Sequence, residues 1–138
     1  MKRNALLRLC FCGLLLMCRP ALIACALPDE ERRELWTGSM YSSTYRAGVC
    51  IKSNGDVYGA LYLRLANGAV DRYTITGKVD GDRVTARHYS GHEFKGRFVS
   101  EETVQGELKL KNGHTLNVLA VRGPEPEVDE FCRLVRKQ

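Results

Sequence analysis

Regularly spaced breaks divide most of this sequence into strand-length segments. Five breaks carry a turn dipeptide, namely Asn54-Gly55, Asn67-Gly68, Asp80-Gly81, Ser90-Gly91 and Asn112-Gly113, and the polar pair Glu101-Glu102 fills the remaining gap. Successive breaks lie 13, 13, 10, 11 and 11 residues apart. Asn-Gly and Asp-Gly tolerate the positive φ angles that tight hairpin turns require. This spacing, one strand plus one turn, predicts an all-β chain.

Apolar and polar residues alternate between these breaks, which is the period of a half-buried strand. Val57, Leu61 and Leu63 share one face, for example, whereas Arg83 and Arg87 lie on the opposite, polar face of a later segment. Strands are predicted over residues 36–41, 45–52, 57–65, 70–79, 83–88, 92–99, 103–110 and 115–122.

About eight hairpin-linked strands in succession predict an antiparallel up-and-down meander that closes into a small barrel, because closure removes exposed sheet edges. Mid-strand glycines at positions 59, 77, 96 and 106 suit the bending that this closure requires. The predicted barrel domain covers residues 36–122. Residues 27–35 are predicted to be an N-terminal arm or short helix, and residues 123–138 a Pro-containing linker followed by a short C-terminal helix.

The first 26 residues have the pattern of a secretory signal peptide. Lys2, Arg3 and Arg8 precede an apolar run over residues 9–17, and the segment contains no acidic residue. The run is shorter than the roughly 20 apolar residues that a membrane-spanning helix needs. Residues 1–26 are therefore predicted to be removed on export, with no transmembrane segment in the remainder.

Two processing sites compete at the end of this segment. Ala24-Cys25-Ala26 fits an Ala-x-Ala cleavage site, which predicts a periplasmic or secreted protein that begins at Leu27. Residues 22–25 resemble a bacterial lipobox, which would place a lipid on Cys25 and tether the protein to the membrane. Arg19 and Pro20 interrupt the apolar run that a lipobox usually continues, and so favour the first alternative.

Charge and cysteine counts change when residues 1–26 are set aside. The whole chain has a net charge of +5 and six cysteines, but four basic residues and four cysteines lie in the leader. The remaining 17 basic and 16 acidic residues give a nearly neutral domain, which argues against nucleic-acid binding. Cys50 and Cys132 remain, and in an oxidising compartment a disulfide between them is predicted; two unrelated buried thiols are the alternative.

Trp36 opens the first predicted strand and Arg122 closes the last one. This layout resembles the calycin-type barrels, the group of lipocalins and avidins, in which a Trp at the first strand packs against an Arg near the end of the barrel. The lipocalin pattern has a glycine before the tryptophan, whereas Gly38 follows it here. The resemblance implies a packed Trp36–Arg122 pair and a calycin-like barrel, and it carries no ligand across.

The segment from Arg87 to Phe94 contains two histidines that flank a predicted turn. A three-residue loop over 89–91 keeps both strands in phase and gives Gly91 a left-handed conformation. His88 and His92 then become cross-strand neighbours, with Cβ atoms roughly 5 Å apart, at a barrel mouth. We interpret them as a pair that closes the barrel end through hydrogen bonds, as part of a ligand site with Tyr73 and Phe94, or as two metal ligands. No third ligand is placed by the sequence, so no metal site is predicted.

The interior of an eight-stranded barrel is either filled by side chains or holds one small ligand. The sequence leaves both open for the inward residues Leu61, Leu63, Ile75, Phe94, Phe98, Leu108 and Leu110. Catalytic motifs such as Gly-x-Ser-x-Gly and His-Glu-x-x-His are absent from the sequence, and no cofactor is predicted.

The expected function is therefore that of an exported, non-enzymatic binding protein of the bacterial cell envelope. Its partner is either an envelope protein or a small ligand. Binding of a small apolar molecule inside the barrel is one alternative. Inhibition of a secreted protease through the arm over residues 27–35 is another.

Overall fold

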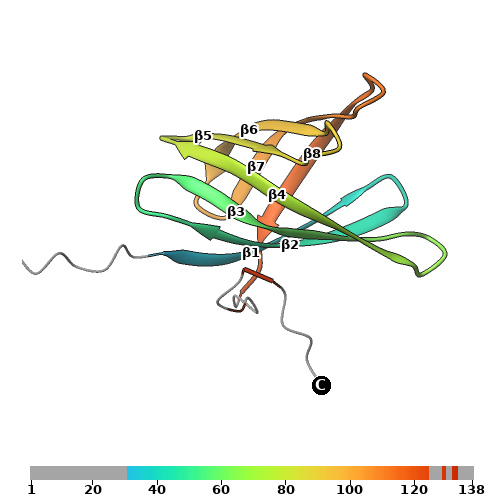
Figure 1. Ribbon diagram of the computed structural model, residues 1–138, viewed down its shortest axis with the longest axis horizontal. Coiled ribbons are helices and arrows are strands. Elements are labelled where there is room, and N and C mark those ends of the chain that lie inside the picture. Colours follow the sequence, from blue (N-terminus) through green and yellow to red (C-terminus); the bar gives the residue numbers. More distant parts are fainter. Residues whose placement is uncertain (1–30, 125–128, 130–131, 134–138) are drawn as a thin grey trace, which may run out of the picture.

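The computed structural model describes residues 31–124, 129, 132 and 133. The strands are β1 (Arg32–Met40), β2 (Ser43–Ile51), β3 (Asp56–Arg64), β4 (Val70–Asp80), β5 (Arg83–Arg87), β6 (Glu93–Ser100), β7 (Thr103–Lys109) and β8 (Thr115–Arg122). Each strand pairs antiparallel with the next, and β8 pairs with β1 to close the barrel (Figure 1). The predicted all-β meander is confirmed, with an architecture consistent with a calycin-like fold.

The largest difference from the predicted strands concerns β1, which begins at Arg32 rather than Trp36. The part of segment 27–35 that the structure describes is thus strand from Arg32 onward, not an arm or a helix. β1 pairs with β2 over its whole length, from Arg32↔Ile51 to Met40↔Ser43. The start of β1 lacks the usual alternation of apolar and polar residues, because the charged Glu34 occupies a buried position.

The hairpin turns gather at two ends of the barrel. Turns 41–42, 65–69, 88–92 and 110–114 lie at one end, here called the mouth. Turns 52–55, 81–82 and 101–102 lie at the other end, here called the base. In Figure 1 the mouth turns point to the right and the base turns to the left.

The most buried apolar side chains of the interior lie mainly in the half of the barrel nearer the base. The buried cluster contains Trp36, Ala47, Val49, Ile51, Val57 and Val104. The ring of Phe98 meets Trp36 edge-on, with centroids 5.8 Å apart. Inward side chains nearer the mouth, such as Leu61 and Leu108, are only partly buried.

Trp36 and Arg122 form the predicted pair, joined by a buried carboxylate. The two residues are cross-strand partners, and the Arg122 guanidinium lies 5.2 Å from the centre of the indole ring. Trp36 Nε1–H donates a hydrogen bond of 2.9 Å to Glu34, whose other oxygen lies 3.3 Å from the guanidinium. Glu34 is only 7% exposed. Arg122 therefore neutralises a charge that the barrel has taken out of water.

The substitution Arg122→Leu is expected to lower the free energy of unfolding by about 3 kcal/mol. The buried Glu34 carboxylate then loses the guanidinium that partly neutralises its charge. Urea denaturation measures this change. Adding Glu34→Gln to Arg122→Leu should recover part of the loss, since the amide oxygen still accepts from Trp36 without a charge. The exposed Arg83→Leu serves as a control. An Arg122→Leu protein as stable as the parent would contradict the role given to the pair.

Cys50 and Cys132 lie at disulfide distance, with Cα atoms 5.6 Å apart and both side chains fully buried. The pair predicted from the cysteine count is thus brought together, which is consistent with an oxidising environment. Asp129 and Arg133 flank a turn closed by hydrogen bonds, and Cys132 has a φ of 58°. A right-handed helix does not pass through a left-handed residue.

No helix is found at the described residues 129, 132 and 133, and the rest of the predicted C-terminal helix lies outside the described residues. The predicted leader over residues 1–26 and the alternative lipidation site Cys25 lie outside the described residues. Within the described part of the chain, no helix meets the length and hydropathy of a membrane span.

Candidate functional site

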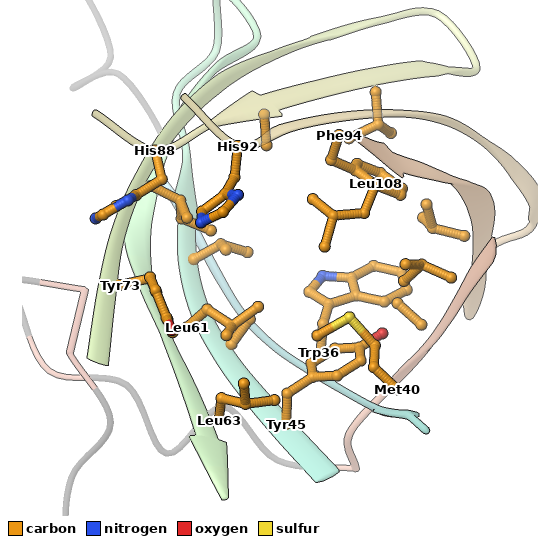
Figure 2. A pocket seen from close by; sticks show the side chains of 18 of the residues that line it. Trp36, Met40, Tyr45, Leu61, Leu63, Tyr73, His88, His92, Phe94 and Leu108 are labelled. Atoms are coloured by element: carbon orange, nitrogen blue, oxygen red, sulfur yellow. The ribbon is translucent and has the colours of Figure 1, made fainter. Parts of the chain in front are cut away.

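The barrel contains a cavity of about 530 Å³, which is lined by the buried cluster and by side chains from there to the mouth. Every strand contributes to its walls, and the side chains in Figure 2 point inward around an open centre. The apolar walls include Met40, Leu61, Leu63, Ile75, Phe94, Phe98, Leu108, Leu110 and Leu116. The interior that the sequence left undecided is therefore hollow rather than filled by side chains.

Two inward positions in the half nearer the base carry no side chain. A Cβ atom at Gly59 would lie 2.0 Å from the carbonyl oxygen of Gly48, and one at Gly77 would lie 2.0 Å from that of Thr85. Neighbouring strands approach too closely at these points for any side chain. Glycine thus permits the strand coiling of a small barrel and adds no side chain to its interior.

The histidine loop at the mouth has the predicted form. His88 N–H donates to the His92 carbonyl at 3.0 Å, Gly91 N–H donates to the His88 carbonyl at 3.0 Å, and Gly91 has a φ of 95°. The three-residue loop over 89–91 is thus confirmed. Both histidines line the cavity, with ring centroids 6.3 Å apart and planes inclined by 17°.

Hydrogen bonds to Nδ1 hold both rings. Ser90 N–H lies 3.3 Å and Ser90 Oγ 2.7 Å from His88 Nδ1, and Lys111 N–H donates to His92 Nδ1 at 3.2 Å. Because Nδ1 accepts from a backbone N–H in each case, we assign the proton of the neutral rings to Nε2. In Figure 2 the His92 ring stands at the cavity edge and the His88 ring turns away from the cavity centre.

Tyr73 connects the histidines to the cavity wall. Its ring meets His88 edge-on at 5.2 Å and His92 at 6.3 Å. Burial raises the pKa of the Tyr73 hydroxyl, and the nearby Asp71 carboxylate raises it further. The structure therefore brings the predicted site residues Tyr73, His88, His92 and Phe94 to the wall of one cavity.

The β1–β2 turn also borders the cavity, and it lies at a break between two predicted strands that carries no turn dipeptide. Tyr41 and Ser42 form a two-residue turn in which Tyr41 has a φ of 53°. Such turns usually carry Gly, Asn or Asp at the positive φ position. With none of these residues present, the strand pairing rather than local turn chemistry holds the turn in place.

Metal ligation has a different candidate from the histidine pair. In the described part of the chain, the close group of ligand-type side chains is Glu31 with Cys50 and Cys132. The two sulfur atoms of this group are bonded to each other, so neither is a thiolate that a metal would require. The group is accounted for by the disulfide.

Tyr45 is the most strongly shifted titratable group on the cavity wall. Its hydroxyl donates to the Leu119 carbonyl at 3.0 Å, and burial raises its pKa to about 12. A Cβ atom at Gly38 would lie 2.4 Å from this hydroxyl, so glycine makes room for the bond. The bond also links β2 to β8 across β1.

Stability is expected to fall as the pH rises above 10. The unfolded chain releases the Tyr45 proton near the ordinary pKa of 10, whereas the folded chain keeps it until about pH 12. The contribution lost by pH 12 is at most about 2 kcal/mol. Urea denaturation between pH 8 and pH 11 should show this decline, and a smaller decline in Tyr45→Phe. An identical pH dependence in both proteins would contradict the assignment.

No protein-family model, curated protein or solved structure matches this chain. The function of the chain is therefore inferred from the cavity itself. Its volume, its apolar walls and the polar groups at its mouth are the features that a ligand would meet.

Proposed function

We propose that this protein binds a small, mainly apolar molecule inside its barrel. The observation that supports this proposal is the cavity of about 530 Å³ with almost wholly apolar walls. Ligand pockets typically enclose about 300–1,000 Å³ and combine apolar walls with a few polar groups. Transfer of an apolar molecule from water onto such walls is favourable by about 25 cal/mol for each Å² buried.

The walls favour a ligand with an apolar body and a polar group at one end. Deep in the cavity, the Trp36 Nε1–H group is bonded to Glu34 and the Tyr45 hydroxyl to the Leu119 carbonyl. A polar ligand atom placed there would lose its hydration without gaining these donors. At the mouth, His92 stands at the cavity edge, and its Nε2–H group suits a ligand oxygen acceptor.

We propose that the protein carries out this binding after export from the cell interior. The paired cysteines support an oxidising compartment, and the predicted leader over residues 1–26 supports export. The protease-inhibitor alternative has less support, because part of the segment proposed as its arm belongs to β1. In this proposal the protein binds its ligand and does not catalyse a reaction.

Titration with N-phenyl-1-naphthylamine, a neutral apolar fluorophore, tests the proposal on residues 27–138. Trp36 is the only tryptophan in the chain and lines the cavity. Bound fluorophore should brighten, saturate at one molecule per barrel and quench Trp36 by energy transfer. Native mass spectrometry of protein from its host should show a bound small molecule. Failure of both measurements would overturn the proposal.

A further inference from the structure

The rim of the cavity carries two large side chains that project into solvent. Tyr41 in the β1–β2 turn is 87% exposed, and Tyr89 in the β5–β6 loop is 93% exposed. Tyr41 occupies a left-handed conformation that glycine would adopt with less strain. An aromatic side chain held outward at an unfavourable backbone position favours a role in contact with something outside the barrel.

The two ends of the barrel differ in charge. The mouth turns and their flanking residues carry Arg64, Arg87, Lys109 and Lys111 against Glu93, all exposed. The base turns and their flanking residues carry Asp56, Asp80, Asp82, Glu101 and Glu102 against Lys52 and Arg83. The chain is thus polarised along the barrel axis, with its basic end around the cavity opening.

We propose that the mouth docks on an anionic lipid surface through Tyr41, Tyr89 and the surrounding basic side chains. Tyrosine rings favour the membrane–water interface, where one end of the ring is apolar and the hydroxyl stays hydrated. Basic side chains are attracted to anionic lipid headgroups. The tyrosines stand on separate hairpins, an arrangement that suits insertion between headgroups better than a continuous protein interface.

Docking in this orientation would open the apolar cavity toward the bilayer. That consequence rests on the proposed function, because it takes the cavity to be a ligand site. The docking itself rests only on the rim. The two proposals can therefore fail separately, and one experiment distinguishes them.

Co-sedimentation of residues 27–138 with vesicles tests the docking, since this part contains every described strand and both paired cysteines but not Cys25. The protein should bind vesicles that contain phosphatidylglycerol, and binding should weaken as salt screens the charges. Phosphatidylcholine vesicles should bind it at least ten-fold more weakly. Equal binding to both kinds of vesicle, or to neither, would overturn the proposal.

Matched variants locate the surface. Tyr41→Asn with Tyr89→Asn should reduce binding at least ten-fold, and asparagine tolerates the left-handed backbone at position 41. Arg64→Gln with Lys109→Gln should reduce it about five-fold for each charge removed. Arg83→Gln with Arg97→Gln removes the same charge from the barrel wall farther from the mouth and should leave binding unchanged. Equal losses in both charge variants would overturn the proposal.

Fluorophore uptake provides the second readout. The charge variants at Arg64 and Lys109 should take up N-phenyl-1-naphthylamine as the parent does, because these exposed side chains are not among the cavity-lining residues. Vesicle binding without uptake by the parent would support docking and contradict the proposed function. Uptake without vesicle binding would support the proposed function and overturn the docking.

Discussion

Replacement of Cys50 and Cys132 by alanine is expected to lower the free energy of unfolding by about 4 kcal/mol. The bond joins residues 82 positions apart, and in the chain-entropy model a loop of this length restricts the unfolded chain by about 4.5 kcal/mol. Both side chains are fully buried, and Tyr58 packs against them. Urea denaturation measures the loss, which should appear as a lower midpoint.

Reduction provides the control for this prediction. A thiol reductant should lower the stability of the parent by a similar amount and leave the double-alanine variant unchanged. The barrel should remain folded at low denaturant, because every strand keeps both of its neighbours. A parent that is insensitive to complete reduction would contradict the stabilising role of the bond.

The substitution Leu61→Trp is expected to weaken N-phenyl-1-naphthylamine binding at least ten-fold. Leu61 points into the open part of the cavity (Figure 2) and is only partly buried. An indole at this position would occupy volume that the fluorophore needs. Extra bulk in a well-packed core usually costs about 1–3 kcal/mol, and the adjoining free space should keep the cost at the lower end.

Leu119→Trp is the matched control for the cavity substitution. Leu119 lies on the outer face of β8 and is 53% exposed, so the same chemical change there leaves the cavity untouched. Both variants carry a second tryptophan, and direct excitation of the fluorophore avoids that complication. Unchanged fluorophore affinity in Leu61→Trp would place the binding site outside the barrel and contradict the proposed function.

Local patterns predicted most of the fold because antiparallel hairpins are built from neighbouring residues. Asn112-Gly113, for example, marks a turn whose strands alternate clearly on both sides, and β8 has the predicted bounds. The exceptions occur where tertiary contacts override the local pattern. The sequence predicts that Glu34 is a surface charge, but it is buried beside Arg122. Tyr41 takes the positive φ position of a turn that usually carries Gly, Asn or Asp.

In the candidate site too, local patterns predicted some features and tertiary contacts decided others. Strand phase alone predicted that His88 and His92 would face each other across a three-residue loop, since side chains alternate with a period of two. The hydrogen bonds that hold the rings come from elsewhere in the chain in one case, because Lys111 belongs to the β7–β8 turn. The exposed tyrosines come from two hairpins that the meander places at the same end, and barrel closure curls that end into one rim.

The sequence by itself determined the strand order, the inward face of each strand and the pair of cysteines available for a disulfide. These properties follow from residue spacing along the chain, which fixes side-chain direction and hairpin connection. Only the tertiary structure decided that the barrel interior is hollow and that Glu34 is buried beside Arg122. Interior volume depends on how strands tilt and stagger around the closed barrel, a property of all eight strands together.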